Sequence, residues 1–449
     1  MNSRNSRNRV PWSRGDKFLM FVLGLALPLA LGLVFWFRAL DQNPTVSIPT
    51  PTMPATNARD YYIAASNAVL DERKIEVARI PGNAAGRPSD SPLPPSLADK
   101  EKLVAENAGA IQLLHRGFQY PYQELPSRSF SATFPHYAKI RALARFLSLQ
   151  AQVDAEKGDM GGAIGASLDV IQMGEQLSHG GPLIGMLYSD DCQAIGRKQA
   201  WAVVNRLNGS QARAAARRLE TIRTGHVPFA DTLQEGKWEG QGSLLELMRK
   251  PDWPANLLTS MASDQQQDQT AANRLMVARI RLAGKRTIMA NFTRYMEQSI
   301  ADARRPYAAH PAPPPLPADP MNQILLPVYT GGRLSEVKAD TQNALLLTTL
   351  ALRAYRLDHG AYPPTLAALT PHYLQAIPAD PFALSGPLRY KLTSAKYLLY
   401  SLGPDGKDDG DAGIFGYTKP APTNAEGSDL RREVQTDSRG DIVAGVNVN

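Results

Sequence analysis

The chain has 449 residues, one cysteine and a formal net charge of +7. This length allows two or three domains, and a single cysteine excludes an intrachain disulfide. The charge is modest for the size, and no basic stripe carries interleaved aromatic residues, so we expect no nucleic-acid partner.

Residues 18–37, FLMFVLGLALPLALGLVFWF, contain no charged side chain. Twenty helical residues rise about 30 Å, which is the thickness of the hydrocarbon core of a bilayer. Pro28 is tolerated in such a helix, and Trp36 suits the headgroup level. The segment predicts one transmembrane helix.

The preceding tail, 1–17, holds five basic residues and one acidic residue. Because basic flanks stay in the cytoplasm, the tail is predicted to be cytoplasmic and the bulk of the chain periplasmic or otherwise extracytoplasmic, in a single-pass protein of a bacterial inner membrane. The alternative is a cleaved signal peptide, whose apolar region is shorter, roughly 7–15 residues. No small-x-small cleavage site follows Phe37, so an uncleaved signal anchor is favoured.

Residues 38–56 are rich in proline and threonine and predict an extended linker. After it, 57–305 is predicted to be an all-helical domain, with Asn57 or Thr56 as the first helix cap. A loop is expected at 80–96, and no helix is assigned to 225–264, where Trp238 and Trp253 would pack on the edge of the core. Helices are expected near 57–74, 97–116, 183–205, 210–223 and 269–303.

The strongest helical block spans 134–222, and its first part, 134–178, predicts two antiparallel helices joined at Lys157-Gly158-Asp159. Glycine commonly ends a helix, and aspartate caps the next one. The turn AEKGDMGGAI resembles the inner turn of a tetratricopeptide-type hairpin, in which a small residue such as Ala163 allows the helices to approach. No second copy occurs at the same period, so a regular solenoid is not expected.

A second, proline-rich linker is predicted at 306–330 and a separate α+β module at 331–449. The module should begin with a long helix, 334–359, that ends at Gly360. A short helix is expected at 365–369, and alternating runs at 388–392 and 396–401 predict a β-hairpin.

This module resembles the globular domain of the major pseudopilins of bacterial type II secretion. The resemblance implies one long helix packed on a small antiparallel sheet. The chain departs from the family because its apolar segment lies some 300 residues upstream and lacks the family's leader site and glutamate. The residues that carry the resemblance occur in one order: Tyr355, Asp358-His359-Gly360, Tyr362-Pro363, Leu366, Leu369, Tyr373-Leu374, Pro378, Asp380-Pro381-Phe382, Gly386, Leu388, Tyr390 and Tyr400-Ser401-Leu402-Gly403-Pro404-Asp405-Gly406.

The loop SLGPDGKDDGDAG, 401–413, gathers four aspartates between glycines. Such a loop offers carboxylate and carbonyl oxygens to Ca²⁺, and the absence of nearby Cys or His argues against zinc or copper. The alternative is a solvated turn. The resemblance implies one structural Ca²⁺, held by the Leu402 carbonyl, Asp405 and either Asp408 or Asp409, with Asp441 as a later ligand.

We find no hydrolase elbow, zinc-protease or phosphate-loop motif, and the histidines lack ligand spacing. Asp190 and Asp191 would raise the pKa of the Cys192 thiol and make it a poor nucleophile. Asp231, Glu235 and Glu239 are candidate acids without an evident partner. We therefore expect no enzyme, no catalytic residue and no small-molecule substrate.

These observations predict a membrane-anchored extracytoplasmic scaffold or interaction protein with a calcium-stabilised, pseudopilin-like C-terminal head. Its partner would be another protein of the cell envelope, in a type II secretion or pilus-like machine. The alternative is a cell-envelope hydrolase whose site lies in the helical domain, in the segment 225–265.

Overall fold

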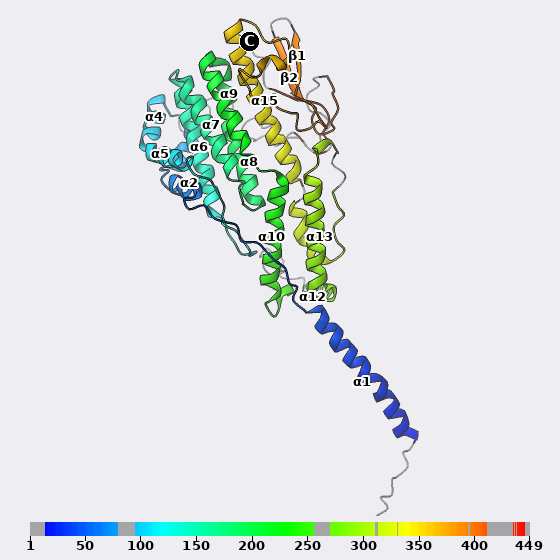
Figure 1. Cartoon of the computed structure of the whole chain (residues 1–449). Helices are drawn as coiled ribbons and strands as arrows, with labels where there is room; N and C mark the ends of the chain where they lie inside the picture. The colour runs from blue at the N-terminus through cyan, green and yellow to red at the C-terminus, as the bar shows by residue number, and fades with distance from the viewer. Residues whose placement is uncertain are drawn as a thin grey trace, which may run out of the picture. The chain divides into compact units, whose positions relative to one another are not determined.

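The computed structural model describes residues 14–79, 95–255, 270–309, 313–329, 331–393, 396–410, 434, 436 and 438–444. Within these ranges the chain is mostly helical, with one small antiparallel sheet (Figure 1). It divides into two compact units. The first comprises Met1–Ser47, Leu244–Thr293 and Leu316–Leu325, and the second comprises Ile48–Ser243, Arg294–Pro315 and Leu326–Asn449.

The first unit contains α1, Arg14–Leu40, which includes the predicted span. Its residues Met20–Leu40 form the one described helix that is long and apolar enough to cross a membrane. Its side chains are exposed, with Phe18, Leu27 and Phe35 each about two-thirds accessible. The same unit holds α12, Thr270–Ala283, and α14, Pro320–Leu325. Residues 1–13 of the predicted tail, 1–17, lie outside the described residues, and its last four residues begin α1.

The second unit is built on helices that lie side by side (Figure 1). Two further helices, α10 and α13, contribute residues to both units. The sequence assigned no helix to 225–264, and this expectation is wrong because α10 fills half of that segment. The bounds are α2 Ala58–Asn67, α3 Glu72–Arg79, α4 Leu97–Glu106, α5 Ala108–Gly117, α6 Pro135–Glu156, α7 Met160–Gln176, α8 Leu183–Val203, α9 Gly209–Thr224, α10 Phe229–Met248 and α13 Lys285–Ala303.

Local signals at the helix ends behave as predicted. Gly158 has a φ of 89°, and the Asp159 side chain accepts a 2.8 Å hydrogen bond from Gly162 N, so the turn between α6 and α7 is confirmed. Asn57 caps α2 by accepting a 3.1 Å bond from Arg59 N. The predicted helix at 97–116 is present but breaks at Asn107 between α4 and α5.

Helices α7 and α8 make their closest contact through glycine. A Cβ placed on Gly196 would lie 2.6 Å from Ser167 O, and one on Gly174 would lie 3.0 Å from Ser189 O. The first distance is shorter than carbon and oxygen allow, so position 196 requires a residue without a side chain, and the second is tighter than most such contacts. Ala163, the residue expected to permit close approach, is fully buried.

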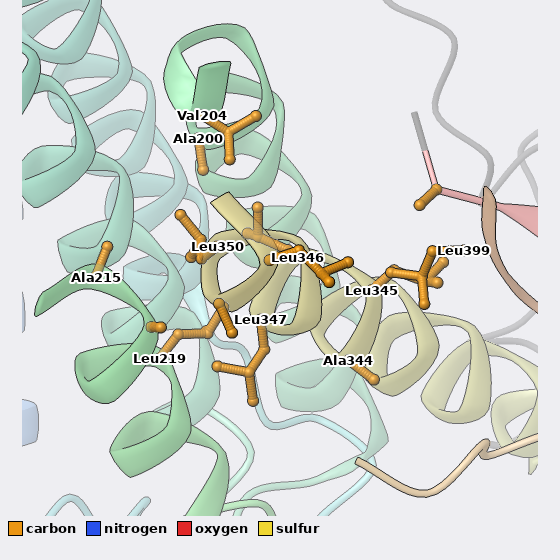
Figure 2. Packing of buried hydrophobic residues seen from close by; sticks show 14 of the residues in the cluster. Ala200, Val204, Ala215, Leu219, Ala344, Leu345, Leu346, Leu347, Leu350 and Leu399 are labelled. Carbon is orange, nitrogen blue, oxygen red and sulfur yellow. The ribbon is translucent and has the colours of Figure 1, made fainter. Parts of the chain in front are cut away.

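The long helix of the C-terminal region is α15, Gly332–His359, and it ends at Gly360 with φ 76°, as predicted. Side chains on all of its faces are buried, which identifies a central helix. Figure 2 shows its leucines between α8 and α9 on one side and β2 on the other; Leu347 faces Leu219, and Leu345 faces Leu399.

The sheet has the order β1-β2-β3, with strands Arg389–Thr393, Lys396–Ser401 and Ile442–Val443. Strands β1 and β2 form the predicted hairpin, in which Thr393 pairs with Lys396. The sequence did not predict β3, which pairs with the end of β2 through Ser401 and Ile442. A 3-10 turn, Leu366–Leu369, replaces the short helix expected at 365–369.

One buried cluster joins α7, α8, α9, α15 and the sheet. It therefore contains side chains from both sides of the proline-rich segment 306–330. Within that segment the chain forms a 3-10 turn at Tyr307–Ala309, helix α14 and a second 3-10 turn at Leu326–Tyr329. The buried ring of Tyr307 packs edge-to-face on Phe382, so part of this segment belongs to the core of the second unit.

Candidate functional site

The loop after β2 turns at glycines, as the sequence suggested. Gly403, Gly406 and Gly410 all have φ between 59° and 72°, a region that other residues rarely adopt. The Asp405 side chain accepts a 3.2 Å hydrogen bond from Lys407 N. These turns bring Asp405, Asp408 and Asp409 together on a short stretch of chain. Asp411 lies outside the described residues.

Asp408 and Asp409 differ in their partners. Asp408 accepts hydrogen bonds from Tyr400 Oη at 3.0 Å and from Gly410 N at 3.1 Å, and it lies 3.8 Å from Arg389 Nε. Asp409 Oδ2 instead accepts a 3.1 Å bond from Gly440 N. The loop is thereby brought to the residue before Asp441, although the two are distant in the sequence.

Asp441 is buried and directly precedes β3. The predicted ligands Asp409 and Asp441 therefore lie on neighbouring segments of chain, because β3 pairs with the strand that leads into the loop. The chemistry of Asp405, Asp409 and Asp441 suits a hard cation, since they offer carboxylate oxygens. In the described part of the chain, no group of three or more His, Cys, Asp or Glu side chains is arranged to hold a metal ion.

Leu402 is fixed by the carboxylate of Asp380, one of the residues that carry the pseudopilin resemblance. Asp380 is buried and accepts hydrogen bonds from Leu402 N at 3.1 Å, Ser401 Oγ at 2.5 Å and Phe382 N at 3.0 Å. It thus holds the start of the acidic loop against the turn at 378–382. A buried lysine acts similarly further on, since Lys338 Nζ donates a 2.8 Å bond to Val434 O.

A second group of polar residues lines a small pocket at the beginning of α15. His226 lies between two carboxylates, with Nδ1 3.1 Å from Glu175 and Nε2 3.3 Å from Glu336. Glu336 also accepts a 2.6 Å bond from Phe229 N and pairs with Arg333. The other polar residues of the lining are Ser178, Ser189, Asp190, Gln193, Asp340 and Asn343.

Burial alone would lower the pKa of His226, but its hydrogen bonds to Glu175 and Glu336 raise it to about 10. The imidazole is therefore positively charged at neutral pH and cannot accept a proton as a general base there. The sequence missed this group because its members come from α7, α8, α15 and the segment before α10. No spacing along the chain marks them.

A third group of polar residues surrounds Glu124, which is buried. Arg59 Nε lies 2.5 Å from it, while Tyr122 Oη and His136 Nε2 each lie 2.9 Å away. Burial would raise the pKa of Glu124, but the hydrogen bond from His136 and the charge of Arg59 lower it to about 2. The group joins α2 and α6 through an internal ion pair.

Glu239 on α10 behaves differently. Burial raises its pKa to about 6, against the lowering effects of Ser127 and Arg128. Glu235, one helical turn earlier, also has a raised pKa through burial and lies 3.5 Å from Arg128. Asp231 is exposed. Of the three acids that the sequence named, two therefore share one face of α10.

Cys192 is fully buried within α8. Asp190 is buried in the same helix, and Asp191 lies 3.8 Å from Arg141 Nε.

No protein-family model matches the chain, and neither a curated protein nor a solved structure is found to be similar to it.

Proposed function

We propose that the chain is a membrane-anchored scaffold of the bacterial cell envelope, held in the inner membrane by α1 with its folded parts outside the cytoplasm. The observation that carries the proposal is the apolar stretch 18–37 of α1, whose described large side chains, such as Phe18, Leu27 and Phe35, are exposed. Lipid is the solvent in which such a surface is stable. The basic residues of 1–17 support a cytoplasmic N-terminus.

Fractionation tests the anchor, and protease protection tests the topology. The intact chain should remain with membranes after alkaline extraction. Protease added to spheroplasts should digest residues after Leu40 and leave the N-terminal tail protected. Recovery of the intact chain in the soluble fraction, or protection of its C-terminal part, would overturn the proposal.

We further propose that the C-terminal module is an interaction head that Ca²⁺ stabilises, in a machine of the type II secretion or pilus class. The resemblance to the major pseudopilins supports this assignment, as does the position of Asp409 beside Gly440-Asp441. Asp408 is already engaged by Arg389 and Tyr400, so Asp409 is the better ligand of the two. The ion would draw together Asp405, Asp409, Asp441 and the Leu402 carbonyl, since the three carboxylates are not arranged around one point in the structure.

Thermal unfolding of the full chain with Ca²⁺ or with chelator tests the ion. Ca²⁺ should raise the melting temperature, because a ligand that binds only the folded state stabilises it. Asp405→Ala and Asp409→Asn should abolish the increase, while Asp408→Asn should retain it. An equal melting temperature in Ca²⁺ and chelator would contradict the assignment. Cross-linking and capture from membranes, with and without chelator, tests the partner.

The second candidate is a cell-envelope hydrolase, which Glu239 favours. A carboxyl group with a pKa near 6 can donate a proton at neutral pH, as a general acid must. Purified chain should then release soluble fragments from peptidoglycan, and Glu239→Gln should stop the release while Asp231→Asn does not. Absence of release by the unaltered chain would exclude this candidate.

A further inference from the structure

The junction of α12 and α13 packs directly on the C-terminal end of α1, within the first unit. Gly284 approaches so closely that a Cβ placed on it would lie 2.9 Å from Leu40 Cδ2. The next residue, Lys285, is buried, and its Nζ lies 2.9 Å from Asp41 and 3.1 Å from Asn43. The residue at the end of the apolar span is thus fixed to the end of α12 (Figure 1).

Helix α12 presents an exposed apolar stripe. Leu275 is 64% and Leu282 50% exposed, and their separation of seven residues places both on one side of the helix. Ala278, also exposed, lies between them. Large apolar side chains exposed in a row mark a surface that another phase or molecule covers.

All charged side chains of α12 itself are basic. The helix, TAANRLMVARIRLA, carries three arginines and no acidic residue. By the helical period, Arg279 lies on one side of the leucines and Arg274 and Arg281 on the other. Arg281 pairs with Asp252 at 3.2 Å, and both side chains are exposed. Leucines between flanking arginines are the pattern of a helix that lies in a membrane surface.

We propose that α12 lies in the headgroup layer of the membrane that α1 enters, with Leu275 and Leu282 in the acyl boundary and its arginines on anionic phospholipid phosphates. The inference rests on the proposed anchor. The observation that selects lipid over a protein partner is the contact of Gly284 and Lys285 with Leu40 and Asp41, since it holds one end of α12 where the span ends. Helix α12 is about 21 Å long, and in this arrangement its axis would lie along the membrane surface.

Fluorescence of the full chain in nanodiscs tests the proposal. A probe sensitive to its environment is attached at Ala278→Cys, with Asp60→Cys as an exposed control; Cys192 is buried. In discs that contain phosphatidylglycerol, the probe at 278 should be quenched by lipids spin-labelled near the headgroup and protected from iodide. The probe at 60 should show the reverse.

Variants of the arginines sharpen the result. Replacing Arg274 or Arg279 by glutamine should each lower the ratio of docked to undocked α12 about fivefold, which corresponds to the value of one cation at an anionic surface. Discs of phosphatidylcholine alone should lower the ratio as well. Equal quenching in both kinds of disc would show that the arginines do not recognise anionic lipid. It would overturn the assignment of anionic phospholipid as their partner.

A probe at Leu27→Cys separates this inference from the anchor. If deep spin labels quench position 27 while position 278 stays accessible to iodide, the anchor holds and α12 is not at the lipid surface. If position 278 is protected from iodide without quenching by any lipid label, protein covers the helix and the proposal is wrong. If position 27 is not quenched, the anchor itself fails.

Discussion

The two longest described helices, α1 with 27 residues and α15 with 28, have opposite surroundings. On α1 the large apolar side chains are exposed along the helix, and between Met20 and Leu40 the share buried is 0%. On α15, Leu346 and Leu350 are fully buried, as are polar residues such as Thr348.

The two helices differ in how their polar groups find hydrogen-bond partners. Polar groups on α15 find partners inside the protein, since Thr348 Oγ1 donates to Ala344 O at 2.8 Å and Asn343 Nδ2 donates to Gln193 at 2.7 Å. On α1 only the backbone needs partners, and the helix supplies them itself. The side chains of α15 therefore require particular neighbouring residues, whereas those of α1 require only an apolar environment.

The largest expected effect comes from reversing the surface of α1. Leu29→Arg together with Leu31→Arg places two charges near the middle of the span, each costing about 2.5–3.5 kcal/mol of insertion free energy. The chain should then be lost from the membrane fraction after alkaline extraction. Leu29→Val is the control and should remain. Retention of the double-arginine chain would mean that α1 does not need lipid.

On α15 the corresponding change is Leu350→Ala, which removes a fully buried side chain. The free energy of unfolding should fall by about 2–5 kcal/mol, measured by urea denaturation. Leu357→Ala on the same helix removes a side chain that is 43% exposed and should cost about 0.5 kcal/mol or less. Similar losses for the two variants would show that α15 is not the centre of the core.

A smaller change in the free energy of unfolding, of opposite sign at two glycines, tests the close contact of α7 with α8. Gly196→Ala should lower the free energy of unfolding by about 1–3 kcal/mol, because its Cβ would overlap Ser167 O. Gly165→Ala on α7 has open space at the Cβ and should raise it by about 0.5–1 kcal/mol through helix propensity. Circular dichroism during thermal unfolding measures both. Stabilisation by both substitutions would disprove the close contact.

The smallest effect concerns His226, which joins α15 to α7. Its pKa is raised from 6.5 to about 10 in the folded chain, so its ion pairs stabilise the fold fully below pH 6.5 and lose this effect as pH rises toward 10. The difference in stability between the unaltered chain and His226→Gln should shrink over that range. Since the side chain is 35% exposed, we expect about 1 kcal/mol or less. A difference independent of pH would exclude the charged form.

Features that depend on nearby residues were predictable from the sequence. The turn at Gly158-Asp159, the end of α15 at Gly360 and the hairpin of β1 and β2 each follow from residues a few positions apart. The prediction of α1 depended only on the length of its apolar stretch and on no contact with another part of the chain. In these cases the chemistry that decides the conformation lies within the element itself.

Features that depend on distant partners were not predictable. Strand β3 has two residues and exists because it pairs with β2. In α10 the glycines look like helix breakers, but Gly236 lies against the ring of Tyr329 and Gly242 against Arg128, where a Cβ would be only 2.7 and 2.8 Å from the neighbour. In the group around His226, this residue and Glu336 alone are 110 positions apart. The calcium site stays a prediction.

The attachments on either side of residues 411–433 have a practical consequence. Before this stretch, Asp409 is tied to Gly440, and after it Val434 is tied to Lys338, so the fold holds both ends in place. Lengthening a stretch with fixed ends is inexpensive, about 0.6 kcal/mol for each doubling. An insertion between residues 410 and 434 should therefore cost the fold little, provided that it leaves the contacts of Asp409 and Val434 intact.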